Sequence, residues 1–166
     1  GESFVIAIND QDDLAQYQYG KEVKHVIRQQ HQKDYIQTAN FINNSDADVC
    51  IMQHEFGIYG GDSGVYVLPL INRIEKPLIT ILHTVLEEPN YLQKLIIQDI
   101  ALHSAKIVVM AKKAVDFLEK VYGISRDKIA LIEHGVPDYP DSIEEILNKK
   151  KVLPGKRVLS TFGLLS

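Results

Sequence analysis

The chain has 166 residues, of which 45% are hydrophobic and 24% charged, a balance typical of a globular domain with a core and not of disordered or fibrous sequences. The formal net charge of -4 offers no basic surface of the kind that neutralises phosphates, so we do not expect nucleic acid as a partner. The single cysteine, Cys50, lies in an apolar run and cannot form an internal disulfide, which favours a reducing, cytoplasmic location. No apolar stretch approaches the roughly 18 residues that a transmembrane helix needs, and no signal-peptide pattern is present, so we expect a soluble chain.

Short apolar runs rich in Val and Ile recur along the chain, as is typical of strands that are covered on both faces. In chain order, the predicted strands are FVIAIND from Phe4, DVCIMQHE from Asp48, PLITILH from Pro77, KIVVM from Lys106, KIALIEH from Lys128 and RVLSTFG from Arg157. Between them, helical patterns predict helices at Gly20–Gln30, Lys33–Ile42, Gly64–Ile74, Tyr91–Ser104, Ala111–Tyr122 (ended by Gly123) and Asp141–Lys150. Strands that alternate with helices of about 10 to 15 residues predict a Rossmann-like α/β fold, a doubly wound and mainly parallel sheet with helices on both faces.

The first predicted helix lies within the basic segment GKEVKHVIRQQHQK. Such a segment is compatible with a helix at a membrane surface, but a solvated helix face explains it more simply. We therefore favour the solvated face.

The end of the chain indicates a second domain. The polar run Asn148–Lys151 and the segment Pro154–Lys156 are typical of a linker, and a new strand then ends in a glycine turn at Gly163. A strand with a glycine turn is how an α/β domain begins. We expect an N-terminal domain at 1–150, a linker at 151–156 and the first strand of a truncated second domain at 157–166.

Polar residues follow several of the predicted strands, and open parallel sheets bind ligands at the carboxyl ends of their strands. Three of the six histidines lie there: His54, His83 and His134. Each alone could be a capping or packing residue, whereas three at one edge favour a polar site. Asn9, Asp10 and Glu55 occupy comparable positions, and capping is an equal explanation for Asn9 and Asp10.

The segment HEFGIYGGDSG is unusually rich in glycine, with Gly57, Gly60, Gly61 and Gly64 between a strand and a helix. Glycines let the backbone approach a ligand closely, and the following helix N-terminus offers free N–H groups. A plain turn capped by Asp62 or Ser63 is the alternative. We favour the ligand loop because a turn seldom needs so many glycines.

Several familiar motifs are incomplete. GDSG at Gly61–Gly64 lacks the barrel fold and the partners of a serine protease, and Ile58 replaces the second histidine that a zincin motif beginning at His54 would require. Neither a dinucleotide-binding G-x-G-x-x-G nor a P-loop is present, and no cluster has the spacing of a metal site. We therefore expect neither a metal nor a cofactor.

Four segments, QHEFGIYGG, PLITILHTVLEEP, HGVPD and STFGLLS in this order, resemble glycosyltransferase family four, a group of retaining enzymes with the GT-B fold. The resemblance covers nearly the whole chain. It implies an acceptor-binding first domain, a donor-binding second domain and a catalytic cleft between them. The implied substrates are a nucleotide-sugar donor and a carbohydrate acceptor, without a metal.

The resemblance also assigns roles to residues. His83 matches the histidine that contacts the transferred sugar. We expect it to orient the hydroxyls of the sugar and to stabilise charge, and not to transfer a proton. Other matches face the acceptor and the cleft or close the first domain: His54, Glu55, Gly57, Tyr59, Gly60, Gly61, His134 and Gly135. Gly163 matches the opening turn of the donor domain.

Two departures from the family pattern shape the expectations for this chain. The family's first strand, with its glycine-containing turn, has no counterpart, and the donor-side residues would follow Ser166, so the chain alone is expected to be inactive. In a doubly wound sheet the first strand is central, and its absence leaves two neighbouring strands unpaired. We expect Arg157–Gly163 to pair in parallel at this position, within its own chain or in a strand-swapped dimer. A peripheral membrane contact of the parent enzyme also stays open.

Two other functions stay open. A nucleotide-sugar 2-epimerase of the same fold would need carboxylates for elimination, for which Glu55 and Glu133 are the candidates at strand ends. A non-catalytic sugar- or partner-binding module on a flavodoxin-like fold is the second alternative.

Overall fold

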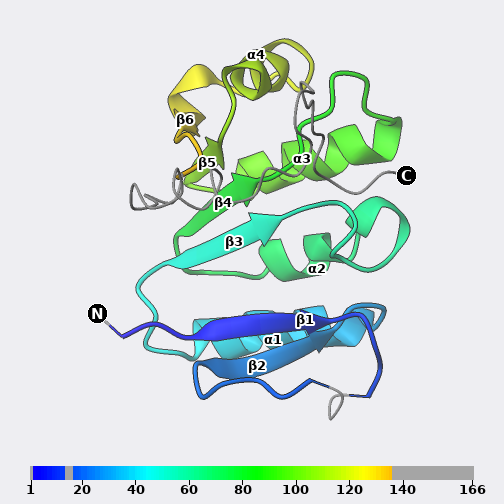
Figure 1. Ribbon diagram of the computed structural model, residues 1–166, viewed down its shortest axis with the longest axis vertical. Coiled ribbons are helices and arrows are strands. Elements are labelled where there is room, and N and C mark those ends of the chain that lie inside the picture. Colours follow the sequence, from blue (N-terminus) through cyan, green and yellow to red (C-terminus); the bar gives the residue numbers. More distant parts are fainter. Residues whose placement is uncertain (1, 14–16, 136–166) are drawn as a thin grey trace, which may run out of the picture. The chain divides into compact units, whose positions relative to one another are not determined.

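The computed structural model describes residues 2–13 and 17–135 (Figure 1). Residues up to Glu133 belong to one compact unit, and a second unit, 134–166, lies almost wholly outside the described residues. The predicted helix Asp141–Lys150, the linker at 151–156 and the strand Arg157–Gly163 therefore lie outside the described residues as well.

The described strands form two parallel sheets. In the first sheet β1 (Val5–Asn9) pairs with β2 (Val23–Arg28). The second sheet contains, in spatial order, β3 (Cys50–His54), β4 (Leu78–Leu82), β5 (Lys106–Val109) and β6 (Ile129–Leu131). The predicted α/β class with a parallel, Rossmann-like sheet is confirmed.

Four α-helices connect the strands: α1 (Gln32–Asn43), α2 (Val67–Ile71), α3 (Tyr91–His103) and α4 (Lys112–Lys120). A capping box fixes the start of α3, because the Asn90 side chain accepts the Gln93 N–H at 2.8 Å and the Gln93 side chain accepts the Asn90 N–H at 2.9 Å. Past the end of α4, Gly123 adopts a φ of 71°, as its predicted capping role requires. α2 is shorter than predicted, because Gly64 has a φ of 80° and cannot belong to a regular helix.

The prediction of a helix at Gly20–Gln30 is wrong, because Val23–Arg28 form strand β2. Ile27 is buried, and His25, two residues before it on the same face of the strand, stacks on Phe41 of α1 with ring centroids 4.9 Å apart. Lys24, on the other face, is exposed. This alternation has the period of a strand, and pairing with β1 decides it. The interpretations of this segment as a solvated or membrane-surface helix are therefore wrong too.

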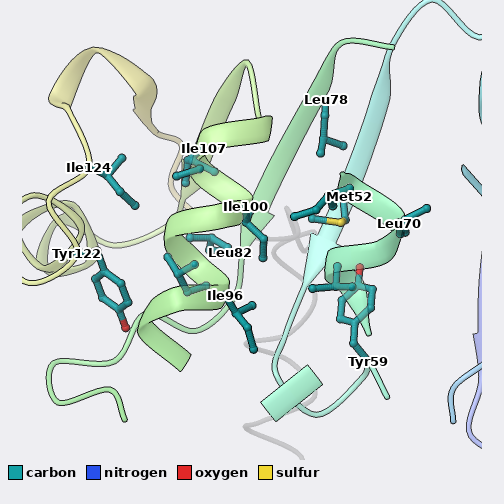
Figure 2. Packing of buried hydrophobic residues seen from close by; sticks show 14 of the residues in the cluster. Met52, Tyr59, Leu70, Leu78, Leu82, Ile96, Ile100, Ile107, Tyr122 and Ile124 are labelled. Atoms are coloured by element: carbon teal, nitrogen blue, oxygen red, sulfur yellow. The ribbon is translucent and has the colours of Figure 1, made fainter. Parts of the chain in front are cut away.

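The helices of the second sheet lie on one of its faces. Each step from β3 to β4, β5 and β6 passes through one helix and moves in the same direction across the sheet. Right-handed crossovers in one direction place their helices on the same side. On that side the strands carry buried residues, such as Met52, Leu82 and Ile107, which belong to the same hydrophobic cluster as Ile96 and Ile100 of α3 (Figure 2).

The opposite face of the second sheet is less covered. The Ile51 side chain on β3 is 63% exposed, and Ile79 and Ile81 on β4 are partly exposed. Parallel sheets are usually covered on both faces.

The two sheets are connected on their helix side and not through strand pairing. The Asn43 side chain at the end of α1 donates to the Arg73 carbonyl at 2.8 Å and accepts the Glu75 N–H at 2.9 Å. Among the described residues, β1 pairs only with β2, and β3 pairs only with β4 on one of its edges. Among the described residues the sheet is therefore divided between β1 and β3. The segment Arg157–Gly163, which the sequence predicts to pair at this position, lies outside the described residues.

Candidate functional site

The carboxyl ends of β3 and β4 bring three predicted site residues to one edge of the sheet. His54 lies opposite Leu82 in the parallel register, and the His83 N–H donates to the His54 carbonyl at 3.0 Å. Glu55 and His83, the residues that follow the two strands, are consequently neighbours. This edge is where the topology of an open parallel sheet places ligands.

His83 is exposed at this edge and is held by Gln53. Its Nε2 lies 2.7 Å from Gln53 Oε1. An amide oxygen only accepts hydrogen bonds, so Nε2 carries the hydrogen, and Nδ1 of the neutral ring is an acceptor without a partner among the described residues. A ligand hydroxyl could therefore donate to Nδ1 of an imidazole whose orientation is already fixed.

The Glu55 carboxylate is also held in place. Its Oε2 accepts the Thr84 hydroxyl at 2.5 Å, and its Oε1 accepts the Phe56 N–H at 3.0 Å. Neither Gln53 nor Thr84 is among the site residues predicted from the sequence. Each residue is adjacent in sequence to a predicted site histidine, which is the one feature that could have indicated it. Their contacts could not be predicted, because they depend on the register between β3 and β4.

His54 is completely buried, whereas His83 is exposed. Its ring stacks on Tyr59 with centroids 5.5 Å apart and meets Phe56 edge-on at 5.2 Å. Neither ring nitrogen has a hydrogen-bond partner among the described residues. Burial lowers the pKa of His54 to about 4, so the ring is neutral at pH 7. His54 is therefore a buried packing residue at this edge and is not a solvent-exposed ligand group.

The glycine loop packs against the segment between β2 and α1. A Cβ on Gly60 would lie 1.8 Å from the Gln29 carbonyl oxygen, and the Gly60 N–H donates to the Tyr35 hydroxyl at 2.9 Å. Gly61 and Gly64 have positive φ angles of 76° and 80°. Close packing at Gly60 and the positive φ angles of Gly61 and Gly64 explain why these positions are glycine without a ligand. This supports a structural turn over a loop built for a ligand.

Other parts of this loop are held by the same segment or by each other. Gly57 has open space around it, and its carbonyl accepts the Gln29 side-chain N–H at 2.8 Å. The Tyr59 hydroxyl donates to the Gln53 carbonyl at 2.8 Å, and burial raises the Tyr59 pKa. The N-cap of the short 3-10 turn is Gly61, and the Ser63 hydroxyl donates to the Asp62 carboxylate at 3.1 Å. The proposed ligand roles of these residues stay predictions.

The end of β1 carries a buried polar residue of its own. Asn9 is 1% exposed, its side-chain oxygen accepts the Tyr19 hydroxyl, and its Nδ2 has no partner among the described residues. Asp10 is exposed and accepts the Tyr17 hydroxyl at 2.6 Å, which lowers the pKa of its carboxyl. Neither contact is a helix cap.

The remaining predicted site residues lie in the second part of the chain. His134 and Gly135 are exposed and belong to the second compact unit, and Gly163 lies outside the described residues. Within residues 2–13 and 17–135, no group of three or more His, Cys, Asp or Glu side chains could hold a metal ion. No helix in that part of the chain is long and apolar enough to cross a bilayer.

Comparison with family models, with curated proteins and with solved structures finds no match to this chain. Its fold class consequently rests on the parallel sheets and helices described above. Any assignment of function rests on the resemblance of the four sequence segments and on the chemistry of the β3–β4 edge.

Proposed function

We propose that this domain is the acceptor-side half of a retaining glycosyltransferase that uses a nucleotide-sugar donor. The observation that carries the proposal is His83, exposed after β4 and held through Nε2 by Gln53. The Glu55 carboxylate and the Thr84 hydroxyl lie on the same edge. Imidazole, carboxylate, hydroxyl and amide groups together offer both donors and acceptors to the hydroxyls of a sugar.

In the proposed reaction, the bond between the anomeric carbon and the donor diphosphate breaks, and a bond from that carbon to an acceptor oxygen forms with retention. The acceptor hydroxyl gives its proton to the departing diphosphate oxygen, and the nucleoside diphosphate leaves. His83 would orient the transferred sugar and stabilise developing charge with a fixed imidazole. Glu55 is already held by two donors, which disfavours the free carboxylate base that a 2-epimerase needs.

Saccharide binding by this chain tests the first part of the proposal. We would titrate the ¹⁵N-labelled chain with nucleotide-sugars and with a panel of soluble oligosaccharides, and follow the backbone amides by NMR. We expect ligand-dependent shifts at His83 and Thr84. His83→Ala should raise the dissociation constant by about tenfold, as expected for one lost hydrogen bond of roughly 1 to 1.5 kcal/mol.

His103→Gln is the matched control, because His103 lies on α3 and bonds to the Asp99 carbonyl within its own helix. It should bind saccharide as the unsubstituted chain does. If no sugar or nucleotide-sugar shifts the β3–β4 edge, or if His83→Ala binds as tightly as the control, the proposal fails.

Transfer itself is tested in a parent enzyme that contains a donor-binding domain. There His83→Ala should lower kcat by about 10²-fold, the usual effect of removing one preorganised donor or acceptor from a transition state. A near-normal kcat with an unchanged melting temperature would reduce His83 to a structural role.

A further inference from the structure

We propose that Gln53 is a positioning residue that sets the ligand preference of His83. Its side chain holds the His83 ring in the tautomer with hydrogen on Nε2, so that Nδ1 accepts a hydrogen bond from a hydroxyl and disfavours an anionic oxygen. The part of this inference that concerns ligands rests on the proposed function, whereas the part that concerns the ring does not.

The strand register brings Gln53 to His83. Gln53 lies opposite Ile81 in the parallel pairing of β3 with β4, and His83 follows Ile81 by two residues. Because successive side chains of a strand point to opposite faces, all three side chains belong to one face of the sheet. A glutamine is long enough to reach along the neighbouring strand, and its Oε1 lies 2.7 Å from His83 Nε2.

Other bonds fix the backbone on both sides of this contact. The Gln53 carbonyl accepts the hydroxyl of the buried Tyr59 at 2.8 Å. The His83 N–H donates to the His54 carbonyl at 3.0 Å. With both backbones held, the amide and the ring meet in a set geometry before a ligand binds, which is the condition for a preorganised site.

His54 shows by contrast what the amide contact adds. Its side chain lies on the opposite face of β3, stacked on Tyr59, and neither ring nitrogen has a partner within residues 2–13 and 17–135. No described contact therefore selects a tautomer of His54. At His83 the Gln53 oxygen makes this selection.

The tautomer decides which ligand groups Nδ1 can meet. A ring nitrogen without hydrogen only accepts hydrogen bonds, so a sugar hydroxyl can donate to it. An oxygen of a diphosphate or a sulfate carries no hydrogen, and its lone pairs would oppose the lone pair of Nδ1. In the proposed transfer reaction, Nδ1 would consequently meet a hydroxyl of the sugar and not the leaving diphosphate.

Substitutions at Gln53 separate the choice of tautomer from packing, and the residue is exposed, so the variants should fold. Gln53→Glu keeps an acceptor and should keep the hydrogen on Nε2. Gln53→Lys offers only donors, so it should move the hydrogen to Nδ1. Gln53→Asn keeps the amide but is one carbon shorter, so it should release the ring and give a mixture of tautomers.

The first measurement needs no ligand. ¹⁵N NMR of the histidine-labelled chain at about pH 8.5, where an ordinary histidine is neutral, distinguishes a ring nitrogen with hydrogen from one without. The signals missing from His83→Gln assign the ring. We expect hydrogen on Nε2 in the unsubstituted chain and in Gln53→Glu, and a ratio of the Nε2–H to the Nδ1–H tautomer that is about tenfold lower in Gln53→Lys. The His54 signals, from the other face, should not change.

The second measurement adds a neutral saccharide that shifts the β3–β4 edge in the titration described above. Its dissociation constant should rise by about tenfold in Gln53→Lys and stay within about twofold in Gln53→Glu. Because the ligand is uncharged, the added charge of either variant acts on it only weakly. Sodium sulfate, compared with sodium chloride at equal ionic strength, should leave the Nδ1 signal of the unsubstituted chain unchanged.

The two measurements fail separately. An equal tautomer ratio in the unsubstituted chain and Gln53→Lys, or hydrogen on Nδ1 in the unsubstituted chain, would overturn the inference whether or not a saccharide binds. If the lysine variant does not fold, an unchanged ratio in Gln53→Asn has the same meaning. Equal saccharide affinity of Gln53→Lys and Gln53→Glu, or a shift of Nδ1 by sulfate, would overturn the ligand preference. A lack of any saccharide binding would refute the proposed function, and the ring measurement would then decide the inference.

Discussion

Acid should destabilise this domain through His54, and replacing that residue with leucine should remove most of the effect. The folded state lowers the pKa of His54 to about 4 by burying it, while in the unfolded chain a histidine titrates near 6.5. The folded state therefore prefers the neutral ring. The stability that depends on it is fully present above pH 6.5 and is lost as the pH falls toward 4.

The size of the effect follows from the difference of about 2.5 pKa units. Each unit corresponds to about 1.4 kcal/mol, so the limiting loss is about 3 kcal/mol, and between pH 7.5 and 4.5 the free energy of unfolding should fall by about 2 to 3 kcal/mol. His54→Leu should abolish this part. Because neither ring nitrogen is hydrogen-bonded within the described residues, the leucine breaks no described polar contact of the ring and should cost less than about 1.5 kcal/mol at pH 7.5.

The assay is urea unfolding at pH 7.5, 6.5, 5.5 and 4.5 of the unsubstituted chain, His54→Leu and the control His103→Gln. Burial also lowers the pKa of His25, but that residue is present in all three proteins and its contribution cancels. The carboxylates with lowered pKa, such as Asp34, lose their contribution only at lower pH. If the unsubstituted chain and His54→Leu lose stability in parallel between pH 6.5 and 4.5, the reasoning is refuted.

Three further predictions concern stability at neutral pH, each measured by urea unfolding. Gly60→Ala should cost about 1 to 3 kcal/mol or more, because its Cβ would meet the Gln29 carbonyl oxygen at 1.8 Å, whereas Gly57→Ala has open space and should change little; equal losses would contradict the packing of the loop. Tyr35→Phe should cost about 1 to 3 kcal/mol, because the buried hydroxyl bonds both the Gly60 N–H and the Gln29 carbonyl, and an unchanged midpoint would contradict this. Asn90→Ala should cost about 1 kcal/mol through loss of the capping box, and Asn90→Asp, which keeps the cap acceptor, should retain most of it.

The sequence predicted the elements whose signals are local. Five of the described strands are nearly continuous apolar runs, and α3 has its cap at Asn90 and α4 its end at Gly123. β2 was missed because its residues fit a helical pattern as well as an alternating one. The choice between them depends on β1, a partner that the segment itself does not contain.

The same distinction applies to the candidate site. The rule that ligands bind at the carboxyl ends of parallel strands was sufficient to bring Glu55 and His83 together. The contact of Gln53 with His83 was not predictable, because it requires the register between β3 and β4. Nor could local sequence show that Gly60 packs against Gln29, since this contact spans 31 residues of chain.

The connection of the two sheets through side chains has a consequence for how the domain opens. β1, β2 and α1 are joined to the remainder by packing of α1 against α2 and by bonds such as those of Tyr35 to Gly60 and of Asn43 to Arg73, while the described residues contain no strand pairing across the division. A continuous ladder makes neighbouring strands unfold together, whereas side-chain packing and isolated hydrogen bonds separate more easily. The N-terminal strands should therefore behave as a cooperative unit of lower stability than β3–β6. Loss of the hydrogen bonds of Tyr35 and Asn43 should therefore make this unit detach more often while the larger sheet stays folded.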